Sequence, residues 1–211
     1  MRADCPVELL MIRALILALL CSVSLGCKTV AFSQPLGSES FQEKDLEAYG
    51  RWYLFEDGEL LEEGVLHFGF DKGLKQSRMI VVGTDLENGE LEVVYRNGYI
   101  NKIGDKNFFS FRNPDETDES NFQIINYEID GDEFIWRCID RDEIEKAVHD
   151  GVLKGYVSVT RSSRFTSTHI QVTDTAENVR RYLVENGNEI FSRCWILSEF
   201  ALRRVQIVEI K

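Results

Sequence analysis

Histidine is scarce in this chain, and the familiar signatures of catalysis are missing. The three histidines, His67, His149 and His169, lie far apart, and no two have the i, i+4 spacing of metal ligands. The sequence has no Gly-x-Ser-x-Gly motif, no phosphate-binding loop and no glycine-rich dinucleotide fingerprint. We therefore expect no bound metal, no cofactor and no enzymatic activity.

Basic residues are outnumbered by acidic ones. Lys and Arg total 24 against 36 Asp and Glu, which gives a formal net charge of −12. A domain with this charge repels phosphate backbones, so nucleic acid is not expected as a partner. It also gains nothing from an anionic lipid surface, so a lipid group would have to supply any anchoring. The densest acidic run, residues 115–119, lacks the alternating pattern of a calcium loop and is more typical of a solvated hairpin tip.

No apolar run reaches the ~20 residues that a membrane-spanning helix needs. A shorter run, Ala14 to Leu20, lies near the N-terminus, with Arg13 before it and small residues after it as far as Cys27. This order predicts a secretory signal peptide over residues 1–26. Translation from Met11 would leave the same mature chain.

The end of this segment, Val23-Ser24-Leu25-Gly26-Cys27, resembles the lipobox of bacterial lipoproteins. The resemblance implies that Cys27 is lipidated, becomes the first mature residue and anchors the protein in a membrane. Ser24 departs from the pattern, since Leu is more usual there. Lys28 follows the cysteine, and the absence of Asp at this position favours the outer membrane, facing the periplasm. The alternative is an ordinary signal peptide that is cut near a cysteine.

The mature chain is expected to have two parts. Residues 27–44 would comprise the lipidated cysteine and a flexible tether, because Ser33, Pro35 and Gly37 fall in a stretch with little periodicity. Residues 45–211 are long enough for one core and would form a single β-rich domain.

Two cysteines remain in that domain after Cys5 and Cys21 leave with the signal peptide and Cys27 takes the lipid. Exported proteins meet oxidising conditions, so Cys138 and Cys194 are candidates for a disulfide. Two buried free thiols are the alternative, because sequence cannot show whether the two residues lie close together.

From Gly50 onward the chain alternates short strand-like segments with turn signals. The dipeptides Asn97-Gly98 and Asp130-Gly131 predict hairpin turns. Capping patterns predict two helices, over residues 140–150 and 174–186. The expected strands are residues 51–55, 65–70, 79–83, 90–96, 99–103, 108–111, 122–129, 133–139, 155–160 and 168–172.

This succession predicts a mainly β fold of the α+β class. An antiparallel meander of this length is expected to close into a small barrel, because closure removes exposed strand edges. Gly50-Arg51-Trp52 resembles the Gly-x-Trp motif that opens the lipocalin barrel. The resemblance implies an eight-stranded barrel in which Trp52 closes the floor and Gly50 permits a tight bend, both as structural residues. The second lipocalin motif is missing, and the helix at 140–150 has no lipocalin counterpart.

Aromatic residues are the remaining clue to function. The chain has 13 Phe, 7 Tyr and 3 Trp, and such side chains either fill a small barrel or line a pocket in a slightly wider one. Our interpretation is a membrane-anchored lipoprotein whose lipocalin-like barrel binds a small apolar ligand. The alternative is a non-catalytic structural or interaction module of the cell envelope with a filled core and a protein partner. A hydrolase with an unrecognised site is a third hypothesis.

Overall fold

The computed structural model describes residues 29–37, 47–56, 59–84, 91–112, 121–161, 166–193 and 200–204. The predicted signal peptide, residues 1–26, lies outside these ranges, as do Cys27 and Cys194. None of the described helices is long and apolar enough to cross a membrane.

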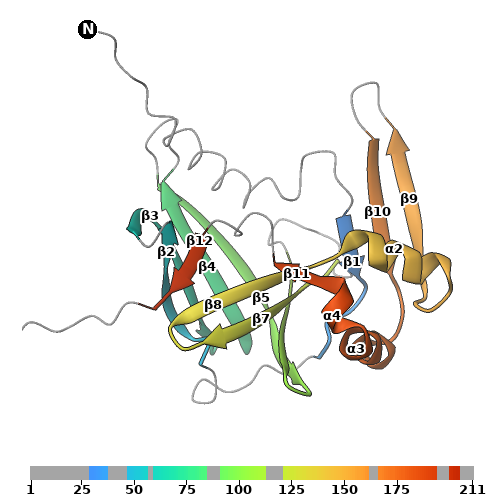
Figure 1. The fold of residues 1–211 in the computed structure, drawn as a ribbon, viewed down its shortest axis with the longest axis horizontal. Coiled ribbons are helices and arrows are strands. Elements are labelled where there is room, and N and C mark those ends of the chain that lie inside the picture. Colours follow the sequence, from blue (N-terminus) through green and yellow to red (C-terminus); the bar gives the residue numbers. More distant parts are fainter. Residues whose placement is uncertain are drawn as a thin grey trace, which may run out of the picture.

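Eight antiparallel strands close into a barrel (Figure 1). Seven of them follow one another along the chain from β2 to β8, and β12 completes the ring by pairing with both β8 and β2. This confirms the predicted meander and its closure. The strands are β2 Gly50–Glu56, β3 Glu59–Asp71, β4 Gln76–Thr84, β5 Leu91–Ile103, β6 Lys106–Arg112, β7 Gln123–Asp130, β8 Glu133–Ile139 and β12 Phe200–Arg203.

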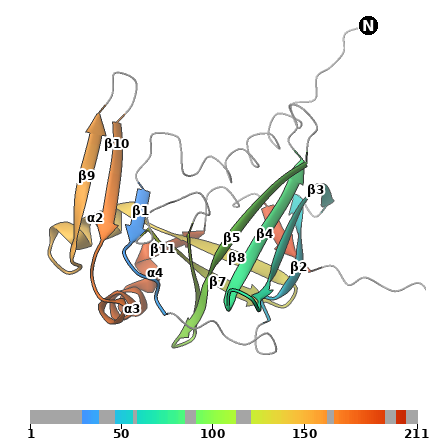
Figure 2. The same ribbon diagram turned by 180° about the vertical axis from the view of Figure 1, so that it is seen from behind.

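A smaller unit is built largely from the segment between β8 and β12, and lies beside the barrel (Figure 2). Its sheet has the order β1-β10-β9, with β1 parallel to β10 and β10 antiparallel to β9. The short strand β11 pairs with β8, along the edge that β12 also uses. The elements are β1 Thr29–Phe32, α2 Arg141–His149, β9 Gly155–Arg161, β10 Thr166–Val172, α3 Ala176–Glu185, α4 Gly187–Ile190 and β11 Phe191–Arg193.

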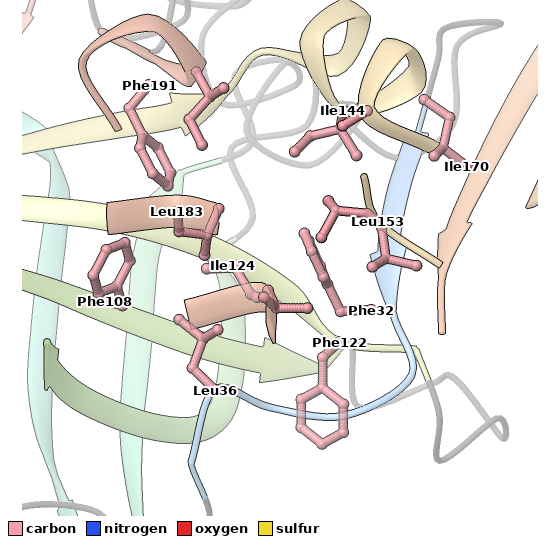
Figure 3. Packing of buried hydrophobic residues seen from close by; sticks show 14 residues of the cluster. Phe32, Leu36, Phe108, Phe122, Ile124, Ile144, Leu153, Ile170, Leu183 and Phe191 are labelled. Atoms are coloured by element: carbon pink, nitrogen blue, oxygen red, sulfur yellow. The ribbon is translucent and has the colours of Figure 1, made fainter. Parts of the chain in front are cut away.

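The hairpin of β6 and β7 is buried on both faces and joins the two units. Phe109 of β6 and Tyr127 of β7 belong to the barrel interior, whereas Phe108 of β6 and Ile124 of β7 belong to a second core. That second core also takes side chains from β1, both longer helices and β10 (Figure 3). Because successive residues of a strand point to opposite faces, these two strands supply both cores.

The first predicted helix begins and packs as its sequence indicates. The Asp140 carboxylate accepts hydrogen bonds from the backbone N–H groups of Asp142 and Glu143, and Ile144 and Ala147 are buried. The second helix, α3, differs at its start. Its cap is Thr175, whose side chain accepts from the Asn178 N–H.

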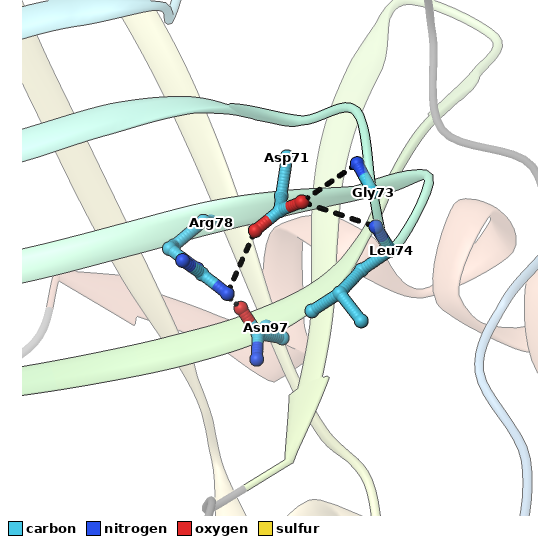
Figure 4. Close-up of polar contacts among 5 residues, drawn as sticks. All are labelled: Asp71, Gly73, Leu74, Arg78 and Asn97. Atoms are coloured by element: carbon cyan, nitrogen blue, oxygen red, sulfur yellow. Dashed lines mark hydrogen bonds and ion pairs between the residues drawn. The ribbon is translucent and has the colours of Figure 1, made fainter.

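Asp71 holds the turn between β3 and β4. One oxygen of Asp71 accepts from the N–H groups of Gly73 and Leu74, at 2.9 and 3.0 Å (Figure 4). The other lies 2.8 Å from the Arg78 guanidinium, which donates to Asn97 Oδ1 at 2.9 Å. The backbone hydrogen bond from Leu74 leads the interactions that hold the Asp71 pKa below its usual value. The turn is thereby tied across β4 to β5.

The predicted hairpin turn at Asn97-Gly98 is wrong. Both residues lie inside β5, a single 13-residue strand. A Cβ on Gly98 would collide with the Ser110 carbonyl oxygen and lie 2.8 Å from Phe111 Cα. The glycine therefore permits the close approach of β6. Glycine often occurs within a strand where another backbone comes this near.

The flexible tether predicted over residues 27–44 is wrong for residues 29–37. Thr29–Phe32 forms β1, which pairs in parallel with residues 169–172 of β10. Phe32 and Leu36 are buried in the second core, and the Leu36 N–H donates to Ser110 Oγ at 3.2 Å. β-Branched and aromatic residues in β1 gain burial here that an isolated tether could not give them. The rest of 27–44 lies outside the described residues.

Candidate functional site

Aromatic side chains gather inside the barrel, around Phe68 on β3. Its ring makes edge contacts with Tyr49, Phe109, Tyr127 and Phe134, at centroid distances of 5.9, 5.0, 6.3 and 6.3 Å. Such contacts place the positive edge of one ring against the negative face of another. Because alternate residues of a strand point to the same face, rings from β3, β6, β7 and β8 meet in one interior.

Phe134 on β8 extends this cluster. It stacks on Tyr127 with centroids 5.2 Å apart and makes edge contacts with Trp52 and Trp136 at 5.1 and 5.7 Å. The interior is therefore a connected set of aromatic rings that reaches from the Trp52 end of the barrel to Trp136.

Two polar atoms within this aromatic interior have no hydrogen-bond partner in the described part of the chain. They are Tyr127 Oη and Trp136 Nε1, and both atoms are buried. Tyr127 and Trp136 stand directly opposite each other in the β7–β8 ladder. An unpaired buried donor costs roughly 1–3 kcal/mol, so a hydrogen-bond acceptor would be favourable at either of these two atoms.

The Tyr127 hydroxyl is held in its protonated form. Burial raises the pKa of Tyr127 above its usual value, and the nearby Tyr49 phenol raises it further. At neutral pH this hydroxyl is therefore a hydrogen-bond donor, and the indole of Trp136 can only donate.

Another polar pair lies near the Trp52 end of the interior. The hydroxyls of Tyr49 and Ser77 are 2.9 Å apart, and Ser77 is fully buried. Among the residues whose burial the structure describes, none of the buried ones is Lys or Arg. The interior thus offers neutral hydrogen-bonding groups on an aromatic background.

Gly50 and Trp52 lie where the first barrel strand begins. Trp52 is fully buried and its indole N–H donates to the Ala48 carbonyl at 2.8 Å. Gly50 has φ +144°, a conformation that L side chains rarely adopt.

Arg204 covers the same end, which sequence reasoning missed. Its guanidinium carbon lies 4.5 Å from the centre of the Trp52 ring. The same group donates to the carbonyls of Glu47 and Tyr49, the latter at 3.2 Å. Arg204 comes more than 150 residues after these partners, so no local pattern could have revealed the contact.

Cys138 is disulfide-bonded. Its partner lies outside the described residues, as does Cys194, so the pairing of these two remains a prediction. Cys138 stands opposite Ser192 of β11 in the ladder. Cys27 also lies outside the described ranges, and its lipidation remains a prediction as well.

The described histidines do not converge. His169 lies 3.0 Å from the Thr29 hydroxyl and 3.2 Å from Gln171 Oε1. His149 is largely exposed on α2, 3.7 Å from a carboxylate oxygen of Glu145, and His67 is exposed on β3. Within the described ranges, no group of three or more His, Cys, Asp or Glu could hold a metal ion.

Comparisons with known proteins give no relative from which a role for this site could be taken. No family model, no curated protein and no solved structure matches this chain.

Proposed function

We propose that this protein is a lipid-anchored, non-catalytic protein of the bacterial cell envelope whose barrel binds a small apolar ligand. The observation that carries the binding proposal is the pair of buried, unpartnered donors, Tyr127 Oη and Trp136 Nε1, within a ring of aromatic side chains. Aromatic and aliphatic walls with a few placed polar groups are typical of small-molecule sites.

The donors limit the ligand's chemistry. Both are neutral at physiological pH, and a buried carboxylate without a cation would be strongly disfavoured. No Lys or Arg is buried among the residues whose burial the structure describes. The proposed ligand is therefore a neutral, mainly apolar molecule with a carbonyl or ether oxygen that accepts from Tyr127 and Trp136.

A direct test uses the mature chain with Cys27→Ser, which keeps it in solution. Native mass spectrometry after purification from the periplasm should show a small co-purifying molecule that is lost on denaturation. A neutral fluorescent naphthyl ketone (prodan) serves as a defined probe. Its binding should weaken roughly fivefold in Tyr127→Phe, the loss expected for one neutral hydrogen bond.

Tyr99→Phe is the matched control. Tyr99 lies on the outer side of β5, packs against the second core and has its hydroxyl satisfied by Gln76 at 2.8 Å. Its replacement should leave probe binding unchanged. A clean apo mass together with no probe binding would contradict the ligand proposal.

The anchoring part of the proposal rests on the lipobox-like sequence that ends at Cys27. Lipidation would give an added mass on Cys27, and Cys27→Ser should move the protein from the membrane to the soluble fraction. Unchanged membrane retention of Cys27→Ser would contradict the anchor.

The close packing of the interior favours a second candidate, an envelope interaction module with a filled barrel. Phe68 and Phe109 lie 5.0 Å apart between ring centres, and both are almost fully buried. In that case the unpaired donors of Tyr127 and Trp136 are a cost of folding, and the probe finds no site. The prodan titration therefore separates the two functions.

A further inference from the structure

The smaller sheet begins almost at the proposed lipid anchor. β1 starts at Thr29, two residues after Cys27. Two extended residues span at most ~7 Å. If Cys27 carries the lipid, Thr29 lies within that distance of the attachment point, and no long tether separates the sheet from the membrane.

The β9–β10 hairpin reaches further in the direction from which β1 comes. Thr29 pairs with His169 of β10, which pairs with Ser158 of β9. Three more ladder positions follow towards the tip of the hairpin, the last joining Arg161 to Thr166. At ~3.3 Å per residue this is about 10 Å beyond Thr29. The hairpin projects past β1 and α2 in both views (Figures 1 and 2).

The chemistry of the hairpin differs from that of the rest of the chain. No Asp or Glu occurs from Gly151 to Thr173, in a chain with 36 acidic residues. Arg161 is exposed near the tip, and Val159 beside it is 52% exposed. The β9–β10 hairpin is therefore basic and apolar, although the whole chain has a net charge of −12.

We propose that the β9–β10 hairpin rests on the anionic headgroups of the membrane that holds the protein. Arg161, at the last ladder position, contacts lipid phosphate, and Val159, two residues behind it on the same face of β9, lies beside the headgroups. This inference rests on the proposed anchor at Cys27, whose short connection fixes the hairpin at the bilayer surface. In this orientation the smaller sheet stands on the membrane surface with the barrel beside it (Figure 1).

The charge and the short connection favour lipid over a protein partner. β9 is the edge strand of its sheet, so an acidic strand of another protein could also pair with it. Such a partner would need a free strand at that edge, whereas the short connection from Cys27 to Thr29 brings the bilayer surface to the hairpin in any case. Lipid headgroups are already there and carry the complementary charge.

The test compares two single-tryptophan additions in the lipidated mature protein. Val159→Trp places the probe on the hairpin, and Val184→Trp places it on α3, where the valine is 40% exposed. Both proteins are reconstituted in vesicles of phosphatidylcholine and phosphatidylglycerol with brominated acyl chains. Bromine should quench the added fluorescence of Val159→Trp well above that of Val184→Trp.

Arg161→Ser in the Val159→Trp background then tests the headgroup contact. Loss of one basic residue at the surface should lower the ratio of docked to undocked hairpin about fivefold, with a matching loss of quenching. Arg181→Ser, at an exposed arginine of α3, is the control and should have no effect. Replacing phosphatidylglycerol by phosphatidylcholine should reproduce the Arg161→Ser result.

The outcomes separate the anchor from the orientation. A mature protein without lipid on Cys27 would overturn both proposals. A lipidated, membrane-bound protein with equal quenching at positions 159 and 184 would leave the anchor standing and overturn the docked hairpin. Quenching at 159 that is insensitive to Arg161→Ser and to lipid charge would overturn the role given to the headgroups.

Discussion

Tyr127 and Trp136 face each other across the β7–β8 ladder, and the polar atom of each side chain is buried without a partner in the described part of the chain. Directly opposed residues have Cβ atoms about 5 Å apart, so both side chains belong to the same face of the hairpin. Replacing Tyr127 by Phe should therefore weaken binding of the proposed ligand without lowering the free energy of unfolding of the barrel.

Tyr127→Phe should leave the free energy of unfolding unchanged or raise it by up to about 1 kcal/mol, because it removes an unsatisfied hydroxyl from an aromatic environment. Tyr99→Phe should lower the same quantity by about 1 kcal/mol, because it removes a hydroxyl that Gln76 satisfies. Urea denaturation of the ligand-free variants measures both. A loss of 2 kcal/mol or more in Tyr127→Phe would mean that its hydroxyl has a partner.

Gly98→Ala should destabilise the protein by about 3 kcal/mol, since the new Cβ collides with backbone atoms of β6 that cannot move aside cheaply. Gly64→Ala is the control. Its Cβ would lie 3.4 Å from the Leu54 side chain, an ordinary contact. Thermal unfolding by circular dichroism compares the two, and equal melting temperatures would contradict the close approach of β5 and β6.

Asp174 makes stability depend on pH. Burial would raise its pKa, but hydrogen bonds from Asn178, Lys154 and Thr175 outweigh burial and hold the pKa below 3.8. The stabilisation is therefore complete above the unfolded-state pKa and is lost as the pH falls through the lower folded-state value. Asp174→Asn should cost about 2 kcal/mol at pH 7, and the cost should shrink below pH ~4.

The measurement for Asp174 is urea denaturation of wild type and variant between pH 7 and pH 3. Asp105→Asn, in the exposed turn after β5, is the control and should change little at any pH. A cost for Asp174→Asn that stays constant down to pH 3 would contradict the role of the ionised carboxylate.

Cys138→Ala should lower the free energy of unfolding by roughly 2–4 kcal/mol, because it removes a disulfide that restricts the unfolded chain. Peptide mapping without reduction should recover Cys138 joined to Cys194. A link from Cys138 to any other cysteine would show that the sequence-based pairing is wrong.

Arg204→Ala should cost about 1–2 kcal/mol, through loss of the cation–π contact with Trp52 and of two hydrogen bonds to carbonyls. Arg203→Ala, whose guanidinium lies 5.6 Å from the Phe55 ring centre, should cost less. Chemical denaturation measures both. Equal costs would mean that Arg204 does not specifically stabilise this end of the barrel.

Local signals predicted elements better than they predicted pairing. The Asp140 cap and the Asp71 turn depend on contacts within three residues, so the sequence contains all the information that forms them. The Asn97-Gly98 dipeptide failed as a turn signal because the same glycine serves a distant requirement, the approach of Ser110. β1 was missed because its partner, β10, follows 140 residues later.

In the candidate site, too, the sequence indicated the local features but not the contacts between strands. The sequence predicted strands over residues 122–129 and 133–139, and its aromatic content indicated rings that fill or line a barrel. Neither observation could show that Tyr127 stands opposite Trp136, because that depends on the register of the β7–β8 hairpin. The Asp174 carboxylate, expected as a helix cap, instead joins the start of β9 to the start of α3.

By itself, the sequence determined the mainly β composition, the meander, the two longer helices and the acidic balance, because periodicity, turn residues and charge act over short distances. Tertiary structure alone decided that the last strand closes the barrel against β2, that residues 29–37 belong to a core, and that Tyr127 and Trp136, each with a buried donor, stand opposite each other. These features depend on contacts between residues far apart in the chain. Their free energy comes from the burial and register of the whole fold, which no single stretch of sequence specifies.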